Sequence, residues 1–280
     1  ALTSGTFNTS GQDFTLISTS NATARIGQIT GGDITGGIIM QRYIDSGTTG
    51  YHFITPPVSG ATLADWDQEM ILSIPDGDNG LACSSSWCFW SVKYYNEADT
   101  GVNSLGYDSL GTINSILEVG RGYWVYTGTG FSTTVPFTFD TRGTTNKNAI
   151  SLPVSYNSSG LPDDDGWNLV GNPYPSTIDW EANGWTKAGL SDAIYVWDPN
   201  QDVFTSYIGG MGTNGGSRYV PSSQAFWVKA TGAPTLAVSE SVKTAWDQTF
   251  LKQSSIYSGV LKLNILGAGC RPEARPVRKH

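Results

Sequence analysis

Two short stretches of the chain place carboxylates beside tryptophan, in a pattern that could support sugar chemistry. The first, DWDQE, holds Asp65, Asp67 and Glu69, and the second, DWE, holds Asp179 and Glu181. Two carboxylates about 5–10 Å apart could cleave a glycosidic bond, one as acid and the other as nucleophile or base. The alternative, which we favour, is that each Asp caps a short helical turn while its tryptophan packs on the body of the protein.

Aromatic residues with polar neighbours are a second group that could carry function. An exposed tryptophan or tyrosine face stacks on a sugar ring, and adjacent polar side chains hydrogen-bond its hydroxyls. The candidates for ligand binding are Trp66, Trp87, Trp90, Trp180, Trp185, Trp197, Asp198 and Tyr174. For each of these tryptophans the alternative is a packed structural role. We expect Trp124 and Trp227, which lie within apolar runs, to belong to the core.

Two acidic turns could bind Ca²⁺. PDGDNG contains Asp76 and Asp78, and LPDDDG contains Asp163 and Asp165. Clustered carboxylates in a turn suit this cation, although neither turn matches the EF-hand pattern. Ordinary solvated turns are the alternative, and we expect no other cofactor.

Cysteines and histidines offer little further chemistry. Cys83 and Cys88, in CSSSWC, could close a small disulfide loop or remain free thiols. The chain has only two histidines, His52 and His280, and no nucleophile elbow for a hydrolase triad. The glycine-rich stretch 209–216 lacks the ending of a phosphate-binding loop, so we expect a flexible loop there.

Composition predicts the elements that must position these residues. The 280 residues include 34 glycines, aromatics make up 12% and charged residues only 14%. This mixture is typical of short strands joined by tight turns, which predicts an all-β fold. A net charge of −8 argues against nucleic acid as a partner and is compatible with neutral glycans. The sequence contains no apolar run long enough to span a membrane.

The middle of the chain contains an apparent internal duplication. GYHFITPPVSGATLADW, from Gly50, aligns with GWNLVGNPYPSTIDW, from Gly166. Further along, VKYYNEAD parallels IYVWDPNQD, and Tyr123-Trp124-Val125 falls on Phe226-Trp227-Val228. Because all three blocks keep their order and approximate spacing, we expect two related β-sandwich or jelly-roll-like halves. The middle of GWNLVGNPYPSTIDW, with Asn168, Asn172 and Tyr174, is not shared between the copies, so recognition peculiar to the second half is expected there.

This alignment sets the expected boundaries. We predict a β-solenoid-like N-terminal segment at 1–49, a first β repeat at 50–148 and a second at 149–246, then C-terminal strands at 247–268 and an atypical basic tail at 269–280. The residues of 36–44 favour a strand. Short helical turns are expected after Thr62 and within Trp180–Leu190.

The second copy resembles a known module. GWNLVGNPYPSTIDW, AIYVWDP and YVPSSQAFWVKATG are similar to a duplicated β-rich module of secreted Bacteroidetes proteins exported by the type IX system, over about residues 1–265. The resemblance implies an extracellular or cell-surface location and assigns no catalytic residues. A C-terminal sorting domain usually follows in that family, whereas this chain continues as CRPEARPVRKH, so that domain is expected to be missing.

The sequence therefore favours a non-catalytic extracellular module that binds polysaccharide, or adheres to a surface, through exposed aromatic residues. A glycoside hydrolase with acids near the two Asp-Trp corners is the first alternative. A structural spacer that presents other domains is the second.

Overall fold

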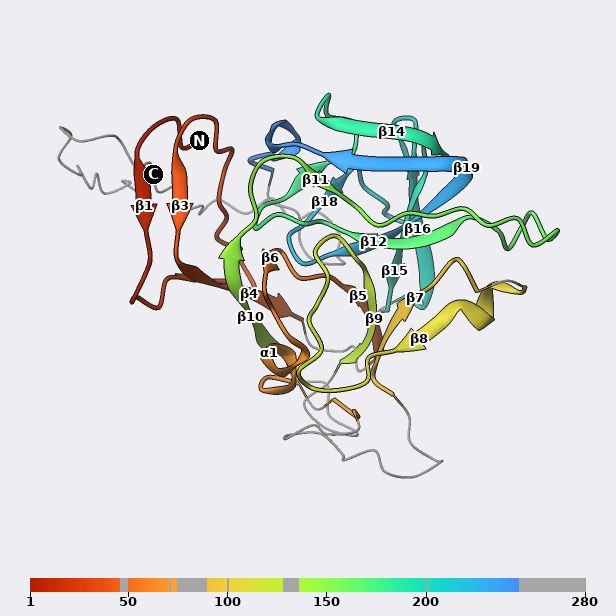
Figure 1. The fold of residues 1–280 in the computed structure, drawn as a ribbon, viewed down its shortest axis with the longest axis horizontal. Coiled ribbons are helices and arrows are strands. Elements are labelled where there is room, and N and C mark those ends of the chain that lie inside the picture. Colours follow the sequence, from red (N-terminus) through yellow and green to blue (C-terminus); the bar gives the residue numbers. More distant parts are fainter. Residues whose placement is uncertain are drawn as a thin grey trace.

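The computed structural model describes residues 1–45, 50–70, 72–74, 90–99, 101–127, 136–199 and 201–246, and it shows an all-β protein (Figure 1). Helix is confined there to α1 (Leu63–Asp67) and two short 3-10 turns, η1 (Asn103–Gly106) and η2 (Glu240–Val242). The expected turn after Thr62 is therefore confirmed. The predicted strand over 36–44 is confirmed as β4 (Gly37–Ile44).

Two four-stranded sheets enclose the core of the first unit. One has the order β2 (Thr15–Leu16), β4, β10 (Phe137–Thr145), β6 (Val58–Ser59). The other has the order β5 (Gly50–Ile54), β9 (Tyr123–Thr127), β7 (Val92–Tyr95), β8 (Tyr107–Ser109). Their facing side chains form a buried cluster with α1, which includes Met40, Ile54, Trp66, Val125 and Phe139. This arrangement is sandwich-like.

The N-terminal segment shares that first core. β1 (Thr6–Asn8) pairs in parallel with β3 (Asp33–Thr35), and β2 pairs in parallel with β4. Leu16, Ile38 and Met40 lie in the same buried cluster as residues of β9 and β10, so β2 and β4 pack with the first unit. The β-solenoid-like character of this segment stays a prediction.

The second unit is built around one long strand. β19 (Ala225–Val238) pairs through its first part with β12 (Trp167–Gly171) and β15 (Ile194–Asp198), and β15 continues to β16 (Val203–Ile208) and β17 (Met211–Thr213). Its second part pairs with β11 (Ile150–Ser151) and β14 (Trp185–Leu190). In the same unit, β13 (Ile178–Asp179) and β18 (Tyr219–Val220) form a separate two-stranded antiparallel sheet. Val170, Trp180, Phe226 and Leu236 belong to its buried core.

Two local expectations in this unit are wrong. Residues 185–190 form β14 rather than a helical turn, because they hydrogen-bond along β19. Residues 211–213 form β17 on β16, where we expected only a flexible loop.

A third core joins the two units. Strand side chains alternate between faces, so Tyr123 and Val125 of β9 point into the first core and Trp124 points away from it. Likewise Phe226 and Val228 of β19 enter the second core, whereas Trp227 points the other way. The outward faces of the two sheets meet in a junction cluster, whose buried members are Phe53, Tyr95, Leu169, Ala225 and Trp227.

The two units share strand order and register. β5-β9-β7-β8 corresponds to β12-β19-β15-β16, and the aligned pairs Phe53–Trp124 and Leu169–Trp227 are cross-strand partners in their sheets. Contacts between units repeat as well. Ile54 bridges Gln224, and the aligned residue Val170 bridges Arg121. The internal duplication stays a prediction, with which these equivalences agree.

Aligned positions also meet each other where the units touch. Gly171 faces Thr55, its counterpart in the first unit, and a Cβ atom on Gly171 would overlap with the Thr55 side chain. Gly122 faces its counterpart Ala225, and its Cβ would lie 2.8 Å from that of Ala225. One member of each pair is glycine because two side chains cannot occupy the same space.

Candidate functional site

The first acidic corner is a helix cap. The Asp65 carboxylate accepts a hydrogen bond of 2.8 Å from the backbone N–H of Thr62, the residue before α1, and lies 3.7 Å from the Arg142 guanidinium. Asp67 is buried and Glu69 is exposed, so these acids of one stretch do not share a single site. The geometry matches capping rather than an acid–base pair.

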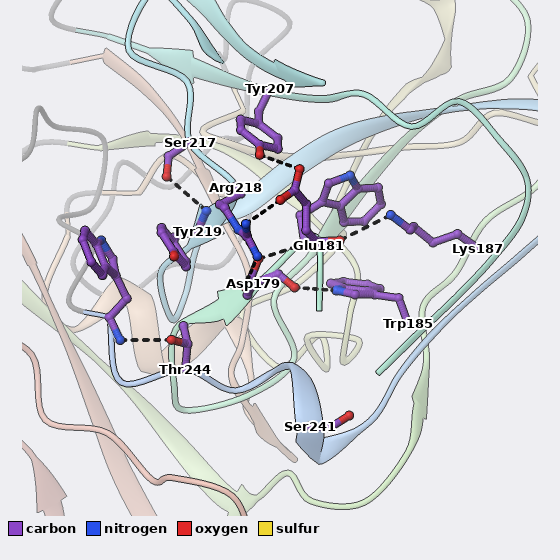
Figure 2. Close-up of polar contacts among 12 residues, drawn as sticks. Asp179, Glu181, Trp185, Lys187, Tyr207, Ser217, Arg218, Tyr219, Ser241 and Thr244 are labelled. Atoms are coloured by element: carbon purple, nitrogen blue, oxygen red, sulfur yellow. Dashed lines mark hydrogen bonds and ion pairs between the residues drawn. The ribbon is translucent and has the colours of Figure 1, made fainter. Parts of the chain in front are cut away.

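The second acidic corner is organised by one arginine (Figure 2). Arg218 donates to both oxygens of Asp179, at 2.7 and 2.5 Å, and lies 2.5 Å from Glu181. The second Glu181 oxygen accepts a hydrogen bond of 2.6 Å from the Tyr207 hydroxyl. These bonds to Asp179, with the charge of Glu181, raise the pKa of Arg218 above its usual value. Because one cation already binds both carboxylates, it competes with a substrate for their oxygens.

The two corners do not form one cleft between facing acids. Trp66 belongs to the first core and Trp180 to the second, and each corner is closed by its own partners.

Three of the proposed aromatic platforms are buried, so their prediction as exposed stacking surfaces is wrong. Trp66 is fully buried and donates to Thr141, and Trp180 is 1% exposed with the ammonium of Lys187 4.2 Å from its ring centroid. Tyr174 is also fully buried, and its hydroxyl donates to the carbonyls of Asn148 and Val238. A sugar ring cannot reach these faces because other parts of the chain cover them.

The remaining ligand candidates have mixed positions. Trp185 is half-buried, packs on Trp180 and donates to the Asp179 carbonyl at 2.8 Å (Figure 2). Trp197 is half-buried against Phe204, while Asp198 is buried and accepts hydrogen bonds from Gln201 in the turn after β15. Trp90 is half-buried. Trp87 lies outside the described residues.

The second acidic turn has a structural role. The Asp165 carboxylate accepts hydrogen bonds from the backbone N–H and hydroxyl of Ser159, and the Asp163 carbonyl accepts from the Trp167 indole at 2.9 Å. In the described parts of the chain, no three His, Cys, Asp or Glu side chains gather as a metal site would need. Asp76, Asp78, Cys83 and Cys88 lie outside those parts, so calcium there and the disulfide stay predictions.

A pocket opens into the junction between the two units. Its volume is about 440 Å³, and aromatic side chains make up almost all of its lining. Every aromatic member comes from a strand of one of the two facing sheets, and Asn103 of η1 completes the wall. The lining residues are Tyr95, Asn103, Tyr107, Trp124, Trp167, Tyr195, Phe204 and Trp227.

The rings of the pocket hold one another edge to face. Tyr95 and Trp227 have centroids 4.8 Å apart, Tyr107 and Trp124 are 5.2 Å apart, and Trp167 and Tyr195 are 5.4 Å apart. Such pairs stabilise each other beyond their burial, which fixes the pocket walls. Trp227 is 6% exposed and forms the deep wall, whereas Phe204 is 42% exposed and lies at the rim.

The pocket is uncharged. Burial raises the pKa of Tyr95 to about 12 and that of Tyr107 further, so both phenols are neutral at physiological pH. The buried indole N–H groups of Trp124 and Trp227 find no hydrogen-bond partner among the described residues. Edge-to-face rings contact both indoles.

Sequence reasoning missed this pocket. Trp124 and Trp227 were expected to be core residues, and Trp227 is buried, but both also line the cavity. The available signal was the continuous apolar character of YWV and FWV. Strands that are buried on both faces have continuous apolar sequences of this kind. Such a run therefore indicates that a second layer packs on the outer face of each sheet.

The fold and pocket together define an all-β protein with an aromatic cavity between two packed sheets. The chain belongs to the family described as "Domain of unknown function (DUF8693)", whose model matches residues 15–257. No curated protein and no solved structure matches it significantly. Within the described residues, no helix is sufficiently long and apolar to cross a membrane.

Proposed function

We propose that this protein is a non-catalytic extracellular binding module that recognises polysaccharide, or adheres to a glycan-bearing surface, through the aromatic pocket. The observation that carries the proposal is the gathering of seven aromatic side chains around one cavity of about 440 Å³. Preformed, mostly apolar pockets of this size are typical of ligand sites, and sugar rings stack on aromatic faces.

Charge supports a neutral ligand. The chain has a net charge of −8, while the pocket lining carries no charged side chain. A polyanion would be repelled by the protein as a whole and would find no cation in the cavity. The resemblance to secreted Bacteroidetes modules supports an extracellular or cell-surface location and export by the type IX system.

Retention on insoluble polysaccharides tests this function. We expect the wild-type chain to be retained by at least one member of a panel, and Phe204→Ala and Trp167→Ala to lose most of that retention because both residues line the pocket. Ile208→Ala is the matched control, since Ile208 is an exposed apolar residue of the same strand as Phe204 and does not line the cavity.

Other outcomes of the same experiment point elsewhere. A wild-type chain retained by no polysaccharide would sink the proposal and favour a structural spacer. Retention that survives both pocket substitutions would move the site away from the pocket. Release of reducing sugar, abolished by Asp65→Asn or Asp179→Asn, would restore the hydrolase alternative.

A further inference from the structure

The pocket lining offers few groups to the hydroxyls of a sugar. Apart from the two unpartnered indole N–H groups, its side-chain polar atoms are the Asn103 amide and the hydroxyls of Tyr95, Tyr107 and Tyr195. A hydroxyl that enters an apolar cavity without a new hydrogen bond loses its water partners, and this loss weakens binding. A pyranose carries several hydroxyls, so an unsubstituted sugar is poorly matched to the deep part of the cavity.

The same walls match a flat apolar ring. Trp227 forms the deep wall, with Tyr95 and Tyr107 edge-on to it at centroid distances of 4.8 and 6.4 Å, and Trp167 edge-on at 6.2 Å. A guest ring between such walls gains the edge-to-face or offset contacts that aromatic groups prefer. The polar Asn103 and the half-exposed Phe204 and Tyr195 belong to the surface side of the pocket.

We infer that the deep part of the pocket takes an aryl group carried by the ligand, with a sugar unit at the mouth near Asn103. This inference rests on the proposed function, because it concerns the same pocket and divides it into an apolar inner part and a polar rim. It names the substrate class more narrowly as a glycan or glycoside that bears an aromatic substituent.

Calorimetry with matched glycosides tests the inference. Phenyl and methyl β-glycosides of glucose, galactose and N-acetylglucosamine differ only in the group that would enter the pocket. We expect at least one phenyl glycoside to bind roughly tenfold or more tightly than its methyl partner, because the phenyl ring buries additional apolar area. Equal affinity within every pair, or no binding by any phenyl glycoside, would overturn the inference.

Two variants locate the binding. Asn103→Trp places a large side chain at an exposed position of the pocket wall, so it should abolish the preference for phenyl without removing a core residue. If Asn103→Trp does not fold, Trp167→Ala tests the same point because it removes a ring that lies edge-on to Trp227 in the deep wall, and Ile208→Ala should bind like the wild type. A phenyl preference that is unchanged in both pocket variants would also contradict the inference.

The result separates the inference from the function on which it rests. Polysaccharide retention with no phenyl preference would support the binding module and contradict only the inference of an aryl group in the pocket. A phenyl preference without polysaccharide retention would support the aryl-binding pocket and contradict polysaccharide as the ligand.

Discussion

His52 is a buried titratable residue of the first unit. It lies in β5, is 2% exposed, and its Nδ1 lies 2.7 Å from the Thr127 hydroxyl and 3.2 Å from the Gly50 carbonyl. The aligned residue in the second unit is Asn168, whose amide donates to the carbonyl of Gly166 at 2.9 Å. A neutral amide therefore makes the corresponding backbone contact in the other half.

This difference predicts a pH dependence of stability. Burial lowers the pKa of His52 to about 4, although nearby Gly50 and Asp198 act in the opposite direction. Between pH 6.5 and 4 the unfolded chain binds the proton and the folded chain does not, so stability falls as pH falls through that window. We expect the loss to reach roughly 3 kcal/mol, measured by denaturant unfolding at several pH values.

His52→Asn provides the matched variant, because Asn occupies the equivalent position and does not titrate. Its stability should vary less between pH 6.5 and 4 than that of the wild type, by about the same roughly 3 kcal/mol. An unchanged pH profile in this variant would mean that other groups cause the acid sensitivity.

At the residue scale, sequence reasoning succeeds where the partner is local. The Asp65 cap was predictable because its partner, Thr62, is three positions away. Packing of Trp180 on the body of the protein was the favoured alternative, but its partner was not predictable, since Phe226, which packs on it at 5.8 Å, lies on a strand remote in sequence. Exposure is decided by the assembled fold, and residue type alone does not determine it.

At the scale of elements, the same distinction separates β4 from β14. β4 is rich in β-branched and aromatic residues, so the strand could be predicted from its own residues, and its burial alternates along the chain. β14 is a mostly exposed strand without such alternation, and it exists because Trp185–Lys187 pair with Leu236–Val238. Tertiary hydrogen bonding overrode the weak local signal for a turn.

Because Thr55 lies against Gly171, we expect substitutions at these two positions to have coupled effects on stability. Gly171→Ala should destabilise the protein by roughly 2–3 kcal/mol, because its new methyl group overlaps with Thr55. Thr55→Gly alone also destabilises, since it removes the hydrogen bond of 2.8 Å from the Thr55 hydroxyl to the Arg121 carbonyl. The double variant should be more stable than the sum of the single effects by at least about 1 kcal/mol.

A double-mutant cycle from chemical denaturation measures this coupling. Gly111→Ala is the control, because nothing lies within 4 Å of the added methyl group, and it should change stability little. Additive effects of Thr55→Gly and Gly171→Ala would show that the two positions do not limit how closely the units pack.

For the whole molecule, the junction core predicts cooperative unfolding. Phe53 is fully buried there and contacts rings from both units, with Trp124 at 5.2 Å and Trp227 at 6.2 Å. We expect fluorescence and circular dichroism to report one coincident unfolding transition. Phe53→Ala should shift that transition as a whole, with a loss of roughly 3–5 kcal/mol. Two separated transitions would show that the units fold independently.

The pocket also belongs to this scale, which explains why it was missed. Its walls come from β7, β8 and β9 of one unit and from β12, β15, β16 and β19 of the other. The repeat alignment predicts that the halves correspond but contains no information about which faces meet. The all-β class follows from composition, whereas the cavity follows only from the docking of two sheets.

The glycine opposite Thr55 determines which unit can pack on this face of the first unit. If two first units met through this face, Thr55 would stand against Thr55, and the space that Gly171 leaves free would be filled twice. The face therefore accepts the other half and rejects a copy of its own half. Two second units would clash instead at Ala225, because a Cβ atom at the position that faces it would lie 2.8 Å from its own.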